Sequence, residues 1–343
     1  MHKRLRTGAS YGKRLSDNTC GDAPSHHEKG VRFQLRPVPG TNLPVLRTFR
    51  VATQLAVCWC KFATREGRPV VEDQILLIND MCGYGKVALA AMLPVLTHMG
   101  YRIHNLPTAL VSDTLNYPKF YIQDCTEYVR NTLPIWDELG FTFDAISTGF
   151  IQSEEESRII ADFCERHAAK GTRIFVDPIM ADHGRLYAGV PKTTIGLMRR
   201  LVSLADCTVP NYTEACLLTD TPVDLERGVS RPEADRLVDG IRKIGARSVV
   251  ITSALVEGRP MVLGYDHLLG ERFALPIQMV DVYFPGTGDI FSSVMIGHVL
   301  RGMPLAQATS RAMEAVRKLI VRNQYQEDKS RGIPIETCLD ALD

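Results

Sequence analysis

The residues most suited to chemistry lie in the stretch PGTGDIFSS, residues 285–293. Gly286, Thr287 and Gly288 allow a tight turn in which successive backbone N–H groups point one way, and a helix predicted from Asp289 adds its positive dipole end. This arrangement suits phosphate oxygens. A carboxylate beside phosphate is unfavourable unless it accepts a proton from an attacking hydroxyl, the role we expect for Asp289. A capped helix start is the alternative that this stretch leaves open.

Two aspartates follow a predicted strand further upstream. The strand RIFVD, 173–177, ends in Asp177, and Asp182 follows in DPIMADHGRLY. Ligands of open α/β sheets bind beyond the carboxyl ends of the strands, so we expect both carboxylates at one crevice. The alternative is that Asp177 caps a turn and that Asp182 is only solvated.

Two more strand ends carry polar side chains. Asn211 and Glu214 have the spacing of a helix capping box, yet Glu214 is also an oxygen ligand of the kind that Mg²⁺ prefers. The two roles are compatible. Thr252 and Ser253 place hydroxyls at the end of another strand, where they bind phosphate or simply close the strand.

The elements that must position these residues alternate along the chain from Gln74 onward. Predicted strands cover 74–79, 144–149, 173–177, 206–210 and 247–252. Helical periods cover 86–99, 123–139, 154–169, 192–204, 212–219, 232–244, 289–301 and 305–323. PMVLGYD and ERFALPI flank HLLG and predict a hairpin at one edge of the sheet. The alternation predicts an α/β fold, a mostly parallel sheet covered by helices, as one domain over 71–343.

The first 70 residues differ from the rest in charge. Residues 1–70 hold 13 Lys and Arg against 4 Asp and Glu, and 71–343 hold 27 against 35, which gives +9 and −8. Clusters of Gly, Pro, Ser and His without a helical or strand period predict a poorly ordered basic extension rather than a nucleic-acid or membrane arm. No apolar run has the length of a membrane helix. Nine scattered cysteines predict reduced thiols and a cytoplasmic protein.

Four motifs in order, DPIMADHGRLY, VPNYTEA, VVITS and PGTGDIFSS, resemble those of the ribokinase-like vitamin kinases. The strongest resemblance is to pyridoxal/pyridoxamine kinases and covers roughly 74–340. It implies a three-layer α/β/α fold and transfer of phosphate from ATP to the 5′-hydroxymethyl group of a B6 vitamer. It also implies Mg²⁺, often a monovalent cation such as K⁺, and usually a homodimer. We expect the protein to bind neither nucleic acid nor membrane.

Site roles follow from this resemblance, position by position. It implies that Asp289 is the base, with Gly286 and Gly288 as the anion hole. The resemblance also implies that Glu214 and Asp177 contact the metal. The residues that it implies for the nucleotide site are Asp177, Asp182, Tyr187, Asn211, Thr252, Ser253 and Thr287.

The vitamer pocket departs from the family pattern. Family members often carry S-N-H-T-G-Y where this chain has SDTLNY, so Thr114 and Leu115 replace the ring-contacting His and Thr. Asp80, Ser112 and Tyr117 are the candidates for contacting the vitamer. The motif DPIMAD also has Ala181 where glycine is usual.

Three other functions compete with this one. A hydroxymethylpyrimidine kinase of thiamine synthesis shares the fold and a similar acceptor, but often has cysteine at the position of Asp289. A sugar kinase typically has G-A-G-D rather than G-T-G-D. A non-catalytic ligand-binding homologue is the third, and intact Asp289 and Glu214 argue against it.

Overall fold

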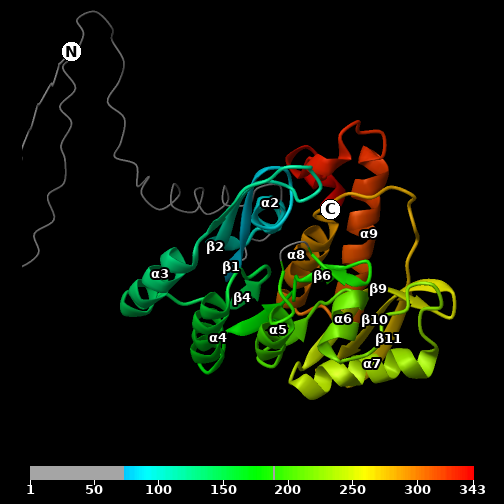
Figure 1. The fold of residues 1–343 in the computed structure, drawn as a ribbon, viewed down its shortest axis with the longest axis horizontal. Coiled ribbons are helices and arrows are strands. Elements are labelled where there is room, and N and C mark those ends of the chain that lie inside the picture. The colour runs from blue at the N-terminus through cyan, green and yellow to red at the C-terminus, as the bar shows by residue number, and fades with distance from the viewer. Residues whose placement is uncertain (1–72, 188–189) are drawn as a thin grey trace, which may run out of the picture. The chain divides into compact units, whose positions relative to one another are not determined.

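The computed structural model describes residues 73–187 and 190–343. In this part a nine-stranded sheet has the strand order β11-β10-β9-β8-β5-β4-β1-β2-β3 (Figure 1). Its strands are β1 Gln74–Tyr84, β2 Arg102–Asp113, β3 Ile122–Asp124, β4 Ala145–Thr148, β5 Arg173–Val176, β8 Cys207–Thr208, β9 Ser248–Val256, β10 Arg259–Asp266 and β11 Glu271–Pro276. Two short strands, β6 Ala181–Asp182 and β7 Arg185–Leu186, pair separately. The predicted extension, 1–70, lies outside the described residues.

Most of the sheet is parallel, as predicted. The run from β2 through β1, β4, β5 and β8 to β9 is parallel, whereas β3, β10 and β11 pair antiparallel. The predicted hairpin is confirmed as β10 and β11 at one edge. The predicted strands omitted β2 and β3, and the helix expected from residue 123 begins only at Thr126, because 122–124 pair with β2.

Helices cover both faces of the sheet and complete the predicted three layers (Figure 1). One face carries α2 Leu89–His98, α8 Thr287–Leu300 and α9 Leu305–Asn323. The other carries α3 Thr126–Glu138, α4 Glu154–Ala168, α5 Thr194–Val202, α6 Tyr212–Leu218 and α7 Arg231–Ile244. Among the described helices, none is long and apolar enough to cross a membrane.

The central strand β1 shows why the sheet needs both layers. Ile75 and Leu77 pack into the core under α2, α8 and α9, whereas Leu76 and Ile78 pack into the opposite core. All four are fully buried. Successive strand side chains point to opposite faces, so a continuous apolar run requires cover on both sides.

Three short 3₁₀ turns follow α9, at Lys329–Arg331, Ile335–Thr337 and Leu339–Leu342. Buried Ile333, Ile335 and Cys338 join the core that contains α2 and α8. The C-terminal part of the chain is therefore packed against the helix that starts after β1.

Candidate active site

Asp289 lies in the first turn of α8 and is partly buried. Its Oδ2 accepts the backbone N–H of Ala88 at 2.8 Å. Burial raises the pKa of Asp289 to about 6, although hydrogen bonds from Ala88, from Asn79 and from its own backbone N–H lower it. At neutral pH the group is mostly ionised, and these three donors still leave part of its lone-pair capacity for a proton.

The backbone beside Asp289 has the form predicted for an anion hole. Gly286 caps α8 with φ 84°, and a Cβ there would lie 2.1 Å from the carbonyl oxygen of Lys86. A Cβ at Gly288 would meet no atom within 4 Å, so the space beside it is open. The Thr287 hydroxyl donates to the Phe284 carbonyl at 3.2 Å. The first N–H groups of a helix have no partner within it, so this turn can donate to an anion.

Asp177 and Glu214 lie near Asp289, at the edge of the sheet where the parallel strands β5 and β8 end. We call this edge the rim. The Ser292 hydroxyl of α8 donates to Oδ2 of Asp177 at 3.1 Å. Burial and the charge of Asp289 raise the pKa of Asp177 to about 7. Burial and the charge of Asp177 raise the pKa of Glu214 well above its usual value. The structure thus brings these three acids together, and a cation among them would stabilise their ionised forms.

Glu214 is also held by the backbone. Oε2 accepts the N–H of Asn211 at 2.9 Å, and Oδ1 of Asn211 accepts the N–H of Glu214 at 3.0 Å. This is the predicted capping box at the start of α6. Oε1 accepts the N–H of Met180 at 3.0 Å and of Ala181 at 3.4 Å. Glu214 therefore ties α6 to the segment that follows β5.

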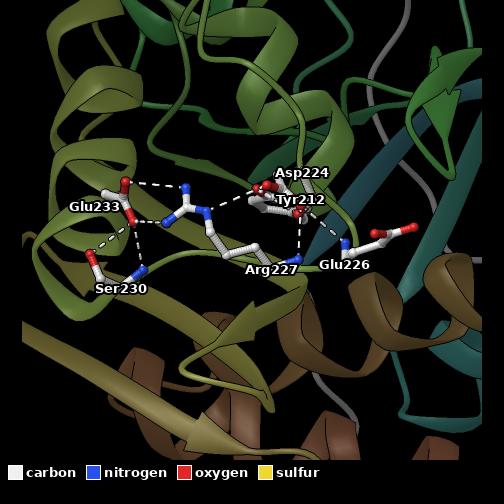
Figure 2. Close-up of polar contacts among 6 residues, drawn as sticks. All are labelled: Tyr212, Asp224, Glu226, Arg227, Ser230 and Glu233. Carbon is white, nitrogen blue, oxygen red and sulfur yellow. Dashed lines mark hydrogen bonds and ion pairs between the residues drawn. The ribbon is translucent and has the colours of Figure 1, made fainter.

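A second capping box lies at the start of α7, where Glu233 accepts the N–H of Ser230 at 2.8 Å. Figure 2 shows this box joined through Arg227 to Asp224, whose carbonyl accepts the Tyr212 hydroxyl at 3.4 Å. The Arg227 guanidinium and the Ser230 donors lower the pKa of Glu233 to about 2. The pKa values of Glu233 and Asp224 are thus lowered, whereas burial raises those of Asp289, Asp177 and Glu214.

The donor set constrains where Mg²⁺ could bind. Among the described residues, no group of three or more His, Cys, Asp or Glu side chains could hold a metal ion. Mg²⁺ requires only one or two protein carboxylates together with waters and phosphates. Both oxygens of Glu214 already accept backbone N–H groups. The residues therefore fit Mg²⁺ bound chiefly through Asp177, with Glu214 acting through water.

Strands β6 and β7 form a flap anchored to α6. The Asn211 side chain donates to the Ala181 carbonyl at 2.7 Å, and the Gly184 N–H donates to the Thr213 hydroxyl at 3.0 Å. Ala181, where the family usually has glycine, is fully buried in the core. The flap accommodates its methyl group and keeps its backbone contacts with α6.

Asp182 and Tyr187 lie on this flap. The Asp182 carboxylate accepts the His183 N–H at 2.7 Å, so it caps the turn of the flap. Burial, followed by the charges of Glu214 and Asp182, raises the pKa of Tyr187. Tyr187 thus lies close to the acids, whereas Asp182 is at the outer end of the site.

Thr252 and Ser253 reach the same rim, but the strand does not end there as predicted. β9 continues to Val256, and its pairing with β10 shifts register across these two residues. Ser253 has φ 58°, in the left-handed region. Thr252 bridges to Asn211, which brings the predicted nucleotide residues together. An irregularity within a strand, rather than its end, presents these hydroxyls.

Asp80 was expected at the end of the first strand, but β1 continues to Tyr84. The pairing of β1 with β2 shifts register between Asn79 and Met81, so Asp80 lies at an irregularity that re-aims its side chain. Burial and the charge of Asp289 raise the pKa of Asp80 to about 7. Asp80 is therefore close enough to Asp289 for the two charges to interact.

Asn79 is a site residue that the sequence analysis missed. It is 2% exposed, and its Oδ1 accepts the N–H groups of Asp80 at 3.0 Å and Phe150 at 2.8 Å. A Cβ at Gly149 would lie 2.4 Å from the Asn79 side chain. A buried amide at the end of an apolar run was the signal available in the sequence.

Ser112 and Tyr117 are on the side of the site formed by β1 and β2. Ser112 is exposed and donates to Asp113 at 2.7 Å. The Tyr117 ring lies 6.0 Å from the ring of Tyr84, centroid to centroid, and its hydroxyl donates to Asp328. Tyr117 and Tyr84 form an aromatic wall, whereas the Ser112 hydroxyl contacts Asp113 of its own strand and accepts the N–H of Tyr121.

Thr114 and Leu115, the two residues that depart from the family pattern, differ from each other in burial. Thr114 is 2% exposed, and its hydroxyl donates to the Ser330 carbonyl at 2.6 Å. Leu115 is 47% exposed. The hydroxyl of Thr114 therefore docks the C-terminal residues. Neither this contact nor those of Lys86 with Arg331 and Glu336 had a local signal in the sequence.

Comparison with known proteins identifies the family of the chain. The sequence model of the phosphomethylpyrimidine kinase family matches residues 77–333. The chain belongs to this family. The predicted α/β fold and kinase class are confirmed, as is the resemblance drawn from the four motifs to pyridoxal and pyridoxamine kinases.

Individual relatives cover most of the described chain. A pyridoxine/pyridoxal/pyridoxamine kinase of Bordetella avium is 30% identical over 283 residues, 75% of this chain and 86% of the relative. A Bacteroides thetaiotaomicron structure that carries the phosphomethylpyrimidine kinase name and contains pyridoxal is 31% identical, with a TM-score of 0.75 over 80% of this chain and 96% of its own. The pyridoxal kinase of Lactobacillus plantarum has 27% identity and a TM-score of 0.71 over 79% of this chain and 96% of its own.

Proposed function

We propose that this protein transfers the γ-phosphate of ATP to the 5′-hydroxymethyl group of a B6 vitamer, such as pyridoxal, pyridoxamine or pyridoxine. The observation that carries the proposal is the position of Asp289, an ionisable carboxylate beside an open helix start with Gly286 and Gly288. Kinase relatives named for pyridoxal support this choice of acceptor.

Asp289 acts as the base of the transfer. Its carboxylate accepts the proton of the hydroxymethyl group while the hydroxyl oxygen bonds to the γ-phosphorus and the bond to the bridging oxygen of ADP breaks. The Ala88 N–H, which donates to Oδ2 of Asp289, fixes the orientation of the carboxylate towards the hydroxyl. Backbone N–H groups from Gly286 to Gly288 bind the phosphate oxygens during the transfer.

The nucleotide lies on the other side of the rim in this proposal. Asn211, Thr252 and Ser253 contact the phosphates, and Tyr187 with Asp182 belongs to the flap over ATP. When bound, Mg²⁺ neutralises phosphate charge. Asp177 would hold it, and Glu214 would contact it through water.

The vitamer ring occupies the side formed by β1 and β2. Asp80, partly buried and at an irregularity of β1, is placed to contact the pyridine ring or its hydroxyl. Tyr84 and Tyr117 supply the aromatic wall, and Ser112 lies at the outer edge. A cation or hydrogen-bond donor on the ring would offset the cost of ionising Asp80.

A pyrimidine acceptor is the second candidate, because the matching family is described as phosphomethylpyrimidine kinase. A panel that follows ATP consumption with pyridoxal, pyridoxine, pyridoxamine and hydroxymethylpyrimidine separates the two. We expect turnover with at least one B6 vitamer. Turnover of the pyrimidine alone would refute the primary proposal, and no turnover with any acceptor would favour a non-catalytic ligand-binding protein.

A cytoplasmic homodimer completes the proposal. The described cysteines support a reducing location, since Cys82, Cys125, Cys164, Cys207, Cys216 and Cys338 are all buried free thiols. Sedimentation equilibrium should give twice the chain mass. A single-chain mass at micromolar concentration would refute the dimer.

A further inference from the structure

The carbonyl oxygen of Lys86 is enclosed by two glycines that lie far apart in the sequence. A Cβ on Gly286 would lie 2.1 Å from this oxygen, and a Cβ on Gly332 would lie 2.7 Å from it. The Gly332 Cβ would also lie 3.1 Å from the carbonyl oxygen of Pro285. Three chain segments therefore meet at one backbone oxygen, where no side chain fits.

The residues 328–336, which we call the C-terminal strap, hold Lys86 in this place. The Lys86 N–H donates to the Arg331 carbonyl at 2.8 Å, and its ammonium pairs with Glu336. The Thr114 hydroxyl donates to the Ser330 carbonyl at 2.6 Å, which docks the strap on the loop after β2. The strap thus contacts two chain segments, one just after Tyr84 and one just before Tyr117.

The strap has its own internal support. The Gln326 amide, just before it, donates to the carbonyls of Asp328 at 2.6 Å and Gly332 at 3.1 Å. Gly332 itself has φ 74°, a conformation that side chains rarely adopt. The close approach to Lys86 is therefore built into the strap by several bonds.

Two residues after Lys86, Ala88 is held in an unfavourable backbone conformation. Its φ is 49° and its ψ is −133°, and it is 4% exposed. A non-glycine residue adopts such angles only when the surrounding structure enforces them. The reason is visible in its N–H, which donates to Oδ2 of Asp289 at 2.8 Å.

We propose that Gly332 is a positioning residue for phosphoryl transfer, because its lack of a side chain lets the strap lie against the Lys86 carbonyl and so keep the Ala88 N–H on the Asp289 carboxylate. Gly332 acts through the segment 86–88 and does not touch the substrate. The inference rests on the proposed function of Asp289 as the base. A displacement of about 1 Å at a reacting group can cost on the order of 100-fold in rate.

The test compares Gly332→Ala with Gly302→Ala. Gly302 has φ 82°, nearly that of Gly332 at 74°, but its Cβ would meet no atom within 4 Å. Both changes place alanine at a positive φ, and only the first pushes on Lys86. We expect Gly332→Ala to lower kcat for pyridoxal phosphorylation about 10- to 100-fold with KM for ATP within about twofold, and Gly302→Ala to leave kcat within about twofold. Equal kcat values for the two variants would overturn the proposal.

Coupling to Asp289 gives a second readout. If Gly332 acts through Asp289, then Gly332→Ala should lower the residual rate of the Asp289→Asn variant by less than about twofold. A full, multiplicative loss in the double variant would indicate a role that does not pass through Asp289, and would overturn the proposal.

Thr114→Val covers the case in which Gly332→Ala does not fold, because it removes only the hydroxyl that docks Ser330. We expect kcat to fall by severalfold with KM for ATP unchanged, and Thr114→Ser, which keeps the hydroxyl, to restore it. Unchanged kcat in Thr114→Val would overturn the strap's positioning role. A wild-type protein inactive with every acceptor would instead refute the proposed function, and this inference with it.

Discussion

Asp289 and Glu214 are both acids in the first turn of a helix, and they differ in how fully backbone N–H groups occupy their two carboxylate oxygens. Glu214 accepts three backbone N–H groups, from Met180, Ala181 and Asn211. Asp289 accepts the N–H of Ala88 through Oδ2, and its own backbone N–H and the side chain of Asn79 also lower its pKa. The difference teaches that burial alone does not make a carboxylate reactive. A carboxylate with its oxygens occupied by the backbone fixes structure, and one with remaining capacity can take a proton.

The two helices that carry these acids also differ in whether side chains cap their first N–H groups. α6 starts with a complete capping box at Asn211. α8 starts at Gly286, whose cap has no side-chain hydrogen bond. The side chains at α6 therefore satisfy their own helix, whereas the N–H groups at α8 stay available to an anion.

The largest expected effect comes from Asp289→Asn. This change keeps the shape and an acceptor for the Ala88 N–H, but it removes the base. We expect kcat for pyridoxal phosphorylation to fall about 10²- to 10⁴-fold with little change in thermal midpoint. Initial rates at saturating ATP and pyridoxal measure this, with calorimetry as the folding control. A normal rate would show that Asp289 is not the base.

Glu214→Gln should have a smaller effect on rate and a larger one on stability. Both oxygens accept N–H groups, so the new amide must oppose at least one of them, at a cost of about 1–3 kcal/mol. We expect a lower thermal midpoint and a rise in the Mg²⁺ concentration needed for half-maximal rate. Thermal unfolding and Mg²⁺ titration of activity measure the two.

Glu233→Gln is the matched control, because Glu233 occupies the same place in the capping box of α7 (Figure 2). It should lower the midpoint slightly and leave the Mg²⁺ dependence unchanged. An equal shift in Mg²⁺ dependence for both variants would mean that Glu214 acts only as a helix cap.

The contrast between the acids was only partly readable from the sequence. The spacing of Asn211 and Glu214 predicted their capping box, and the glycines before Asp289 predicted an anion site, because both signals are local. The hydrogen bond from the Ala88 N–H to Asp289 joins residues about 200 positions apart, so no local sequence spacing predicts it. The strand β2 was missed because RIHNLPTALVSD mixes Asn and Pro with its apolar residues and is set by pairing with β1.

Asp80→Asn should show how much the buried carboxylate of Asp80 destabilises the protein when it is ionised. The pKa of Asp80 is raised to about 7, so the native state favours the neutral form. The stabilisation from that form is complete below its usual pKa and is lost as the pH rises through about 7. Asparagine stays neutral, so we expect the midpoint to rise by about 5 °C at pH 8 and to change little at pH 4. Equal shifts at both pH values would contradict a raised pKa.

The pH dependence of kcat for pyridoxal phosphorylation by the wild-type protein tests the central claim most directly. Asp289 must be ionised to accept the hydroxyl proton, and burial raises its pKa to about 6. The account predicts a kcat that is level above pH 7 and falls towards tenfold per pH unit well below pH 6, with Mg²⁺ and ATP kept saturating. A kcat that stays constant from pH 8 down to pH 5 would contradict the assignment of Asp289 as the base.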